Sequence, residues 1–359
     1  MSFIGTYLTK AVAMRASDIH LKEKEPALVR IDGGIALLDE NYPDMEAVFK
    51  ELYELCSEDL REHLLSEIKK LRDVSISFAA LDGKYRVRAT LYRDEKGKAV
   101  SMRIISGAPS DISTLGLPET LLNVCTLNRG LFIVTGATGS GKSTTLAAMI
   151  NQINKTRAGH IITLEDPIEY IIPSERCLVT HREIGRHVES FATGLRSILR
   201  EDPNVVVIGE LRDLESMRAA VQIAETGHLV LTTLHTRNAP STIDRLIGSF
   251  PPDDQHQIRM MLADNLIGVL AQTLIPRRDS GRIGAFELLL NNDAVKNNIR
   301  EAKIYQIENT LQTGAKQGMI CMEDYIIELI RQGFVEYETA LAFAPSKAKL
   351  EAKLKAVFG

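Results

Sequence analysis

Tryptophan is absent from this chain of 359 residues, and its four cysteines are isolated from one another. Without a C-x-x-C pair the sequence indicates neither a zinc site nor a disulfide framework, so we expect reduced, mostly buried thiols. No apolar run approaches the roughly 20 residues of a membrane-spanning helix, and the N-terminus lacks the features of a signal peptide. We therefore expect a cytoplasmic protein.

A large excess of charge is also lacking, because the formal net charge is −4 and the pI is about 6.1. This balance gives no overall attraction to nucleic acid, although a local basic patch is compatible with it. The absence of tryptophan weakens the case for base stacking, and we expect no direct contact with nucleic acid. The hydrophobic content of 45% is enough for a large core, and the length suggests two or three domains.

A phosphate-binding loop is the most specific signal in the sequence. Residues 136–143 fill the pattern G-x-x-x-x-G-K-[ST], and the flanking apolar strand and expected helix argue against an ordinary glycine-rich turn. The glycines let backbone N–H groups converge on phosphate oxygens. Lys142 is expected to neutralise the β- and γ-phosphates of ATP, and the Ser143 hydroxyl to bind magnesium. The expected nucleotide-binding residues are Gly136, Ala137, Thr138, Gly139, Ser140, Gly141, Lys142, Ser143 and Thr144.

The first 105 residues or so predict a small α+β domain with an antiparallel sheet. An amphipathic helix is expected at residues 2–14, and Asp82 and Gly83 form the expected turn of a hairpin. Strands with alternating apolar residues are expected at 17–21, 74–78, 85–91 and 100–104.

From residue 131 the pattern changes to alternating strands and helices, which predicts an α/β domain with a parallel sheet. Its apolar runs span residues 131–134, 161–164, 205–208 and 229–231. After about Asn291 apolar residues recur at helical spacing, so a helical C-terminal region is expected. The expected divisions are an N-terminal domain (1–107), a turn-rich linker (108–117), the α/β core (118–290) and the helical region (291–359).

Two glutamates follow apolar strands at positions suited to hydrolysis, which needs a magnesium partner and a group that orients water. Glu210 follows the strand 205–208, and Gly209 occupies the place of the usual magnesium-binding aspartate. Glu210 is therefore expected to accept from a metal-bound or attacking water. Glu165 follows the strand 161–164 and is the candidate for orienting the attacking water. An ordinary loop or helix-start charge is the alternative for both.

Two histidines flank the apolar strand 229–234. His235 follows its carboxyl end and is expected to sense the γ-phosphate. His228 precedes its amino end, about 23 Å away in an extended strand, so it reaches a phosphate only if a neighbouring subunit brings a second site near. A structural histidine is the alternative for His228.

The N-terminal domain contains four arginines of interest. Arg86 and Arg88 are expected on one face of a strand, opposite the apolar face, and Arg93 and Arg103 are expected to join them across the sheet. A solvated face is the ordinary interpretation. Because the α/β core has no evident arginine finger, these arginines are also candidates for neutralising charge in a transition state.

Four motifs, in the same order, resemble the Walker A, Asp box, Walker B and His box of the secretion and pilus ATPases. They span residues 135–146, 163–170, 202–213 and 226–236. The segments 16–21 and 259–276 also resemble the family, so the resemblance covers nearly the whole chain.

Two further segments are informative about the subgroup. Residues 274–285 lack the cysteines of the metal module that is typical of assembly and type II secretion ATPases. Residues 294–301 are similar to the motif of retraction ATPases of the PilT type, from which Lys296 and Asn298 depart. The resemblance therefore favours a retraction ATPase and leaves an accessory retraction paralogue open.

The resemblance implies a RecA-like α/β core, a PAS-like N-terminal domain and a homohexameric ring, with ATP held between that domain of one subunit and the core. It implies that Arg86, Arg93 and Arg103 contact the γ-phosphate, within the subunit or from the adjoining one. The implied partner is a pilus platform protein of the inner membrane, with the ATPase in peripheral contact at its cytoplasmic face.

The resulting hypothesis is a magnesium-dependent ATPase motor for type IV pilus retraction, in which Glu165 and Glu210 position water for in-line attack. Three alternatives remain open: an assembly or type II secretion ATPase, a nucleic-acid translocase with the same core, and a scaffold that binds ATP and barely hydrolyses it.

Overall fold

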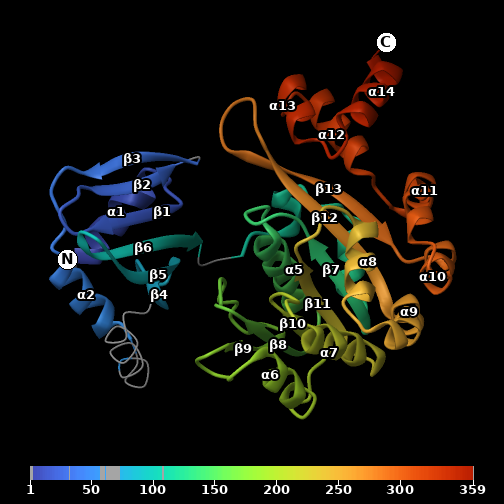
Figure 1. Ribbon diagram of the computed structural model, residues 1–359, viewed down its shortest axis with the longest axis horizontal. Helices are drawn as coiled ribbons and strands as arrows, with labels where there is room; N and C mark the ends of the chain where they lie inside the picture. The colour runs from blue at the N-terminus through green and yellow to red at the C-terminus, as the bar shows by residue number, and fades with distance from the viewer. Residues whose placement is uncertain (1–2, 32, 57–60, 62–72, 107–108, 359) are drawn as a thin grey trace. The chain divides into compact units, whose positions relative to one another are not determined.

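The computed structural model describes residues 3–31, 33–56, 61, 73–106 and 109–358, which fall into two compact units (Figure 1). The first unit comprises residues 1–108 and the short segment 167–171, and the second comprises residues 109–166 and 172–359. The chain therefore leaves the second unit directly after Asp166 and returns to it at Ile172. Within the described ranges, no helix has the length and apolar character needed to cross a membrane.

A six-stranded antiparallel sheet forms the first unit, in the order β3-β2-β1-β6-β5-β4. Its described elements are α1 (Phe3–Ala13), β1 (Asp18–Lys22), β2 (Ala27–Ile31), β3 (Gly34–Asp39), α2 (Met45–Glu54), β4 (Val74–Ala80), β5 (Tyr85–Asp94) and β6 (Gly97–Ser106). Leu8 of α1 and Val48 of α2 share an apolar core with Ile19 and Val87 of the sheet. The predicted α+β domain with an antiparallel sheet is confirmed.

A seven-stranded sheet organises the second unit, in the order β13-β12-β7-β11-β10-β8-β9. Its strands are β7 (Gly130–Thr135), β8 (Gly159–Glu165), β9 (Cys177–Glu183), β10 (Val205–Ile208), β11 (Leu229–Leu234), β12 (Leu266–Pro276) and β13 (Arg282–Leu290). β13 pairs antiparallel with β12, and the other neighbouring strands are parallel. The four apolar runs of the sequence are β7, β8, β10 and β11, so the predicted parallel core is confirmed.

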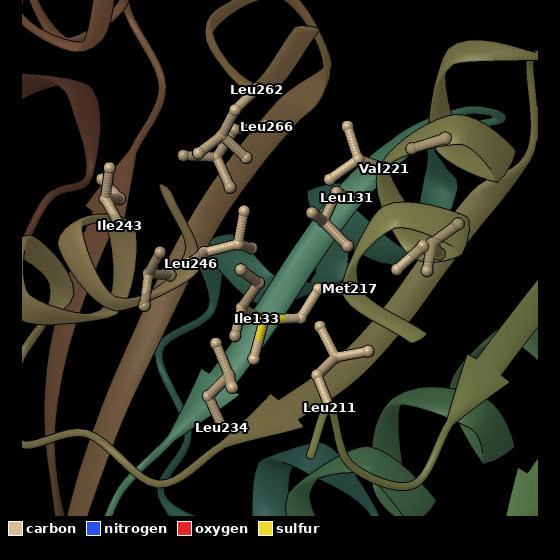
Figure 2. Packing of buried hydrophobic residues seen from close by; sticks show 14 of the residues in the cluster. Leu131, Ile133, Leu211, Met217, Val221, Leu234, Ile243, Leu246, Leu262 and Leu266 are labelled. Carbon is tan, nitrogen blue, oxygen red and sulfur yellow. The ribbon is translucent and has the colours of Figure 1, made fainter. Parts of the chain in front are cut away.

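Helices cover this sheet because its central strands are apolar on both faces. Leu131 and Ile133 of β7 pack in one cluster with Met217 and Ile243 (Figure 2). Strand alternation directs the buried Phe132 to the opposite face. The helical elements before β13 are η1 (Ile112–Leu115), α4 (Thr120–Thr126), α5 (Lys142–Thr156), α6 (Phe191–Ile198), α7 (Leu214–Glu225), α8 (Ala239–Gly248) and α9 (Pro252–Asn265).

The chain after β13 is helical, as predicted. Its elements are α10 (Asp293–Arg300), η2 (Ile304–Gln306), α11 (Ile307–Thr313), η3 (Ala315–Gln317), α12 (Met322–Arg331), α13 (Tyr337–Phe343) and α14 (Lys347–Phe358). Val295 of α10 and Leu311 of α11 belong to the core that also covers the sheet. Helices α12 to α14 build a separate cluster around Ile275 of β12 and Ala285 of β13.

Replacing Ile133 with alanine should lower the free energy of unfolding of the second unit by about 2–5 kcal/mol, because a fully buried side chain is lost and a cavity remains. The control is Leu178→Ala in β9, whose side chain is 58% exposed and whose loss should change the free energy by less than about 1 kcal/mol. Urea unfolding followed by circular dichroism measures both changes. Equal destabilisation by the two substitutions would contradict this description of the core.

Candidate active site

The carboxyl ends of β7, β11, β10 and β8 lie at one edge of the sheet, because these strands are parallel and pair in register. The phosphate loop follows β7, His235 follows β11, Glu210 follows β10 after one residue, and Glu165 ends β8. At about 4.8 Å between neighbouring strands, β10 lies about 10 Å and β8 about 14 Å from β7. The structure therefore aligns His235, Glu210 and Glu165 beside the loop, in that order.

The phosphate loop adopts backbone conformations that require its glycines. The φ angle is +148° at Gly136, +78° at Gly139 and +90° at Gly141, a region that other residues rarely adopt. A Cβ atom at Gly136 would lie 2.3 Å from the carbonyl oxygen of Gln272. The loop leads into α5 at Lys142, so the N–H groups of a helix N-terminus face it and favour an anion.

The Lys142 ammonium lies within the loop. Its Nζ donates to the carbonyl oxygens of Gly136 (2.9 Å) and Ala137 (3.0 Å), and it is 3.4 Å from Nδ1 of His235. The residue is only 8% exposed. Phosphate oxygens placed in the loop would therefore replace carbonyl oxygens as the partners of a buried positive charge.

His235 connects Lys142 to Glu210. Its Nε2 is 3.1 Å from Oε2 of Glu210, and the other oxygen of this carboxylate pairs with Nε of Arg212. A guanidinium nitrogen of Arg212 also lies 3.3 Å from the Asp166 carboxylate. The Glu210 side chain is 17% exposed. A row of alternating charges thus runs from the loop along the edge of the sheet.

Gly209 is explained by the close approach of β10 and β8. Its N–H donates to the carbonyl oxygen of Leu164 (2.8 Å), and a Cβ atom there would lie 3.3 Å from this oxygen and 3.4 Å from Cα of Glu165. An aspartate at this position would therefore be crowded. Glu165 itself is near His181 of β9, with 3.5 Å between Oε1 and Nδ1, so its described partner lies on the side of β8 away from the loop.

Hydroxyl groups hold the segment after His235 against the start of the loop. The Thr236 N–H donates to Oγ1 of Thr135 (2.9 Å), and the two hydroxyl oxygens are 2.6 Å apart. Thr236 Oγ1 is also 2.6 Å from Oγ1 of Thr242 in α8. The backbone directly after His235 is therefore fixed to the residue that precedes the phosphate loop.

The structure does not bring His228 to the loop of its own chain. This residue precedes β11 at the amino edge of the sheet, and its Nδ1 lies 3.1 Å from Thr226 Oγ1 and 3.2 Å from the Ile223 carbonyl oxygen. The expectation that His228 is catalytic therefore has no support within one chain, because β11 separates it from the site. Its described contacts are those of a structural histidine.

The Arg86 side chain is largely buried in the first unit, at 9% exposure. Its Nε donates to the carbonyl oxygen of Ile168 (2.9 Å), which belongs to the segment 167–171 of the same unit. Arg86 therefore holds the segment that contains the second half of the Asp box.

The other arginines do not share one face. Arg88 lies opposite Arg103 in the pairing of β5 with β6, and Nε of Arg103 is 2.9 Å from Oδ1 of Asp18. Arg93 lies opposite Lys98. Because Arg93 is an odd number of positions from Arg88 along an uninterrupted pairing, its side chain is on the other face of the sheet. The prediction that Arg93 joins this face is wrong, whereas Arg103 does lie on it.

The loop fits a nucleotide with magnesium. Ser140 is 5% exposed, and its Oγ has no hydrogen-bond partner among the residues that the structure describes. The described chain holds no group of three or more His, Cys, Asp or Glu residues suited to a metal ion. Magnesium commonly needs only one or two protein ligands beside phosphate oxygens and water. Ser143 in the first turn of α5 and Glu210 are the residues that would hold it.

The family model of type II/IV secretion system proteins matches residues 1–281 of the chain. The chain belongs to this family. It is 42% identical to the uncharacterized protein YggR of Escherichia coli, over 90% of this chain and 97% of YggR. It is 38% identical to the type IV pilus retraction ATPase PilT of Pseudomonas aeruginosa, over 90% of this chain and 93% of PilT.

A crystal structure of the pilus retraction motor PilT with bound ADP is similar over 98% of this chain and 99% of the PilT chain. The TM-score is 0.86, at 39% sequence identity. The resemblance to secretion and pilus ATPases of the PilT type, and the fold class that it implies, are thus confirmed.

The sequence alone did not identify two residues that contact the candidate site, Arg212 and Gln272. Arg212 follows Glu210 by two residues, and its place after an apolar strand end was the available signal. Gln272 is 5% exposed in β12 and contacts the phosphate loop. A single glutamine within the apolar run 266–276 was the available signal for it.

A buried carboxyl group supports the segment that follows His235. Glu287 of β13 is 8% exposed, and its Oε1 accepts from the N–H of Ala239 (2.7 Å), the first residue of α8. Burial raises the pKa of Glu287 to about 7, although the hydrogen bond from the Ala239 N–H opposes this shift. The negative charges of Glu323 and Glu308 raise the pKa further, and the positive charge of Lys349 lowers it.

The raised pKa of Glu287 predicts a pH-dependent stability. The unfolded chain releases this proton near pH 4.5 and the folded chain near pH 7, so stability contributed by the proton is lost as pH rises through this window. Glu287→Gln keeps an acceptor for Ala239 but does not ionise. Its free energy of unfolding relative to wild type should therefore rise between pH 5 and pH 8, by up to about 3 kcal/mol. Thermal unfolding at both pH values measures this, and a difference that is independent of pH would contradict it.

Proposed function

We propose that the chain is an ATP-hydrolysing motor that powers retraction of type IV pili. The observation that supports this proposal most directly is the row of Lys142, His235 and Glu210, which joins a phosphate loop to the carboxyl edge of a parallel sheet. The likeness to the PilT retraction motor extends along nearly the whole of both chains, and it supports the pilus as the structure on which this motor acts. In this proposal the motor is a homohexamer in the cytoplasm, and it acts on a pilus platform protein of the inner membrane.

The proposed chemistry assigns a step to each residue of the row. The N–H groups of the loop and of the first turn of α5 bind the phosphates, and Lys142 exchanges its carbonyl partners for phosphate oxygens. Ser143 and Glu210 would hold magnesium, which would neutralise negative charge on the phosphates. Glu210 orients the attacking water for in-line displacement, and His235 reports the γ-phosphate to Glu210 through its contact with that carboxylate.

Two further assignments are part of the proposal. Glu165 assists in orienting water, for which its carboxylate has to turn from His181. Arg103 contacts a γ-phosphate, for which its ion pair with Asp18 has to open. The Arg103 side chain is 61% exposed, so screening by solvent makes this exchange inexpensive.

Replacing Glu210 with glutamine should lower the turnover of ATP by at least about 100-fold, because an amide is a poor base for orienting water. ATP should still bind within about threefold of the wild-type affinity, because the phosphate loop is unchanged. Lys142→Ala is the comparison variant and should lose binding itself. Phosphate release and equilibrium ATP binding are the two measurements.

Full hydrolysis by the Glu210→Gln variant would remove Glu210 from the mechanism. A wild-type protein that binds ATP and releases almost no phosphate would instead be a nucleotide-gated scaffold. Hydrolysis strongly stimulated by single-stranded DNA would support the translocase alternative.

The direction of work is tested in cells. A strain that lacks this chain should carry more pili than its parent, and these pili should not retract, because assembly continues without its counterpart. Pilus counts by electron microscopy and live imaging of labelled pili measure both. A bald strain would instead identify an assembly motor.

A further inference from the structure

Gln272 is a buried polar side chain in the largely apolar strand β12. It is 5% exposed, and the two residues before it, Leu270 and Ala271, are fully buried. Burying an amide group without hydrogen bonds is unfavourable, because the group gives up its hydrogen bonds to water. An amide at this position therefore requires partners.

The partners of Gln272 belong to the phosphate loop and to the helix that follows it. Its Nε2 donates to the carbonyl oxygen of Ser140 (2.5 Å), and its Oε1 accepts from the hydroxyl of Thr145 (2.8 Å). Ser140 lies within the loop, and Thr145 lies in the first turn of α5. A carbonyl oxygen can only accept, so the amide orientation is fixed by Ser140 and leaves the oxygen for Thr145. One side chain thus ties the loop to the helix that follows it.

The backbone of the loop is shaped around β12. Ala271 pairs with Thr135, which places Gln272 beside the first residue of the loop. A Cβ atom at Gly136 would lie 2.3 Å from the carbonyl oxygen of Gln272, and one at Gly141 would lie 3.2 Å from its Nε2. Two glycines of the loop therefore permit close approach to this strand as well as to phosphate.

We propose that Gln272 is a positioning residue for nucleotide binding, which holds the N–H groups of the loop in their binding arrangement through Ser140 and Thr145. The inference rests on the proposed nucleotide site, but it concerns binding and needs no hydrolysis. A loop held in shape loses less conformational freedom when phosphate binds, so the amide raises affinity. Its loss should raise the KM for ATP and the Kd for ADP, with little effect on kcat.

The first test is Gln272→Met, which keeps the length of the side chain and removes both hydrogen bonds. The Kd for ADP, measured by calorimetry on the full chain, should rise about tenfold, and the KM for ATP should rise with it. The kcat should stay within about threefold of wild type. Thr273→Val is the matched control on the same strand. By alternation its side chain points away from Gln272, so ADP affinity should not change.

The second test uses the other end of the contact. Thr145→Val removes the hydroxyl with nearly the same shape and should weaken ADP binding about threefold, whereas Thr145→Ser keeps the hydroxyl and should bind like wild type. The double variant Gln272→Met, Thr145→Val should bind no more weakly than Gln272→Met alone, because the partner of Thr145 is already gone.

Unchanged ADP affinity in Gln272→Met would overturn the inference, as would an equal loss in Thr273→Val. If Gln272→Met does not fold, the two variants at Thr145 test the inference instead. Equal ADP affinities of Thr145→Val and Thr145→Ser would then overturn the inference. Failure of the wild-type protein to bind ADP would contradict the proposed nucleotide site itself, so the two failures are distinguishable.

Discussion

Parallel pairing of β7, β11 and β10 in register is the constraint on which the site depends. These strands are apolar along both faces, so a slip of one residue would exchange the packing of Leu131 with that of Phe132 and disturb the helices on both sides. The same pairing ends the three strands at one edge. The phosphate loop, His235 and Glu210 are therefore placed together by the core rather than by contacts among themselves.

The charged groups of the site have partners within the chain, and a nucleotide has to compete with these. Lys142 is bound by loop carbonyls, and Glu210 by Arg212 and His235. The pair of Arg212 with Glu210 is partly exposed, so it contributes about 1 kcal/mol or less to stability. Such pairs are suited to exchange in a motor, because a phosphate can replace them without a large penalty. The buried amide of Gln272 is different, since it fixes the loop around which these exchanges occur.

The sequence predicts the site where the signal is local. The phosphate loop and the strand-end position of Glu210 need only a motif and an apolar run, and alternation along β5 already separates Arg93 from Arg88. The order of the strands is not local, because it is set by packing between segments far apart in the chain. The same limit applies to Gln272 and to the contact of Arg86 with Ile168, which joins residues 82 positions apart. Such contacts are visible only once the fold has brought the segments together.

The central claim is that hydrolysis at the edge of this sheet drives retraction, and it is tested most directly in a living cell. A strain lacking the chain is supplied with the wild-type gene or with the Glu210→Gln variant, and retraction events of labelled pili are counted at equal protein levels. The account predicts that the wild-type protein restores retraction and that the variant leaves pili extended. Retraction restored by the variant at the wild-type rate would contradict it.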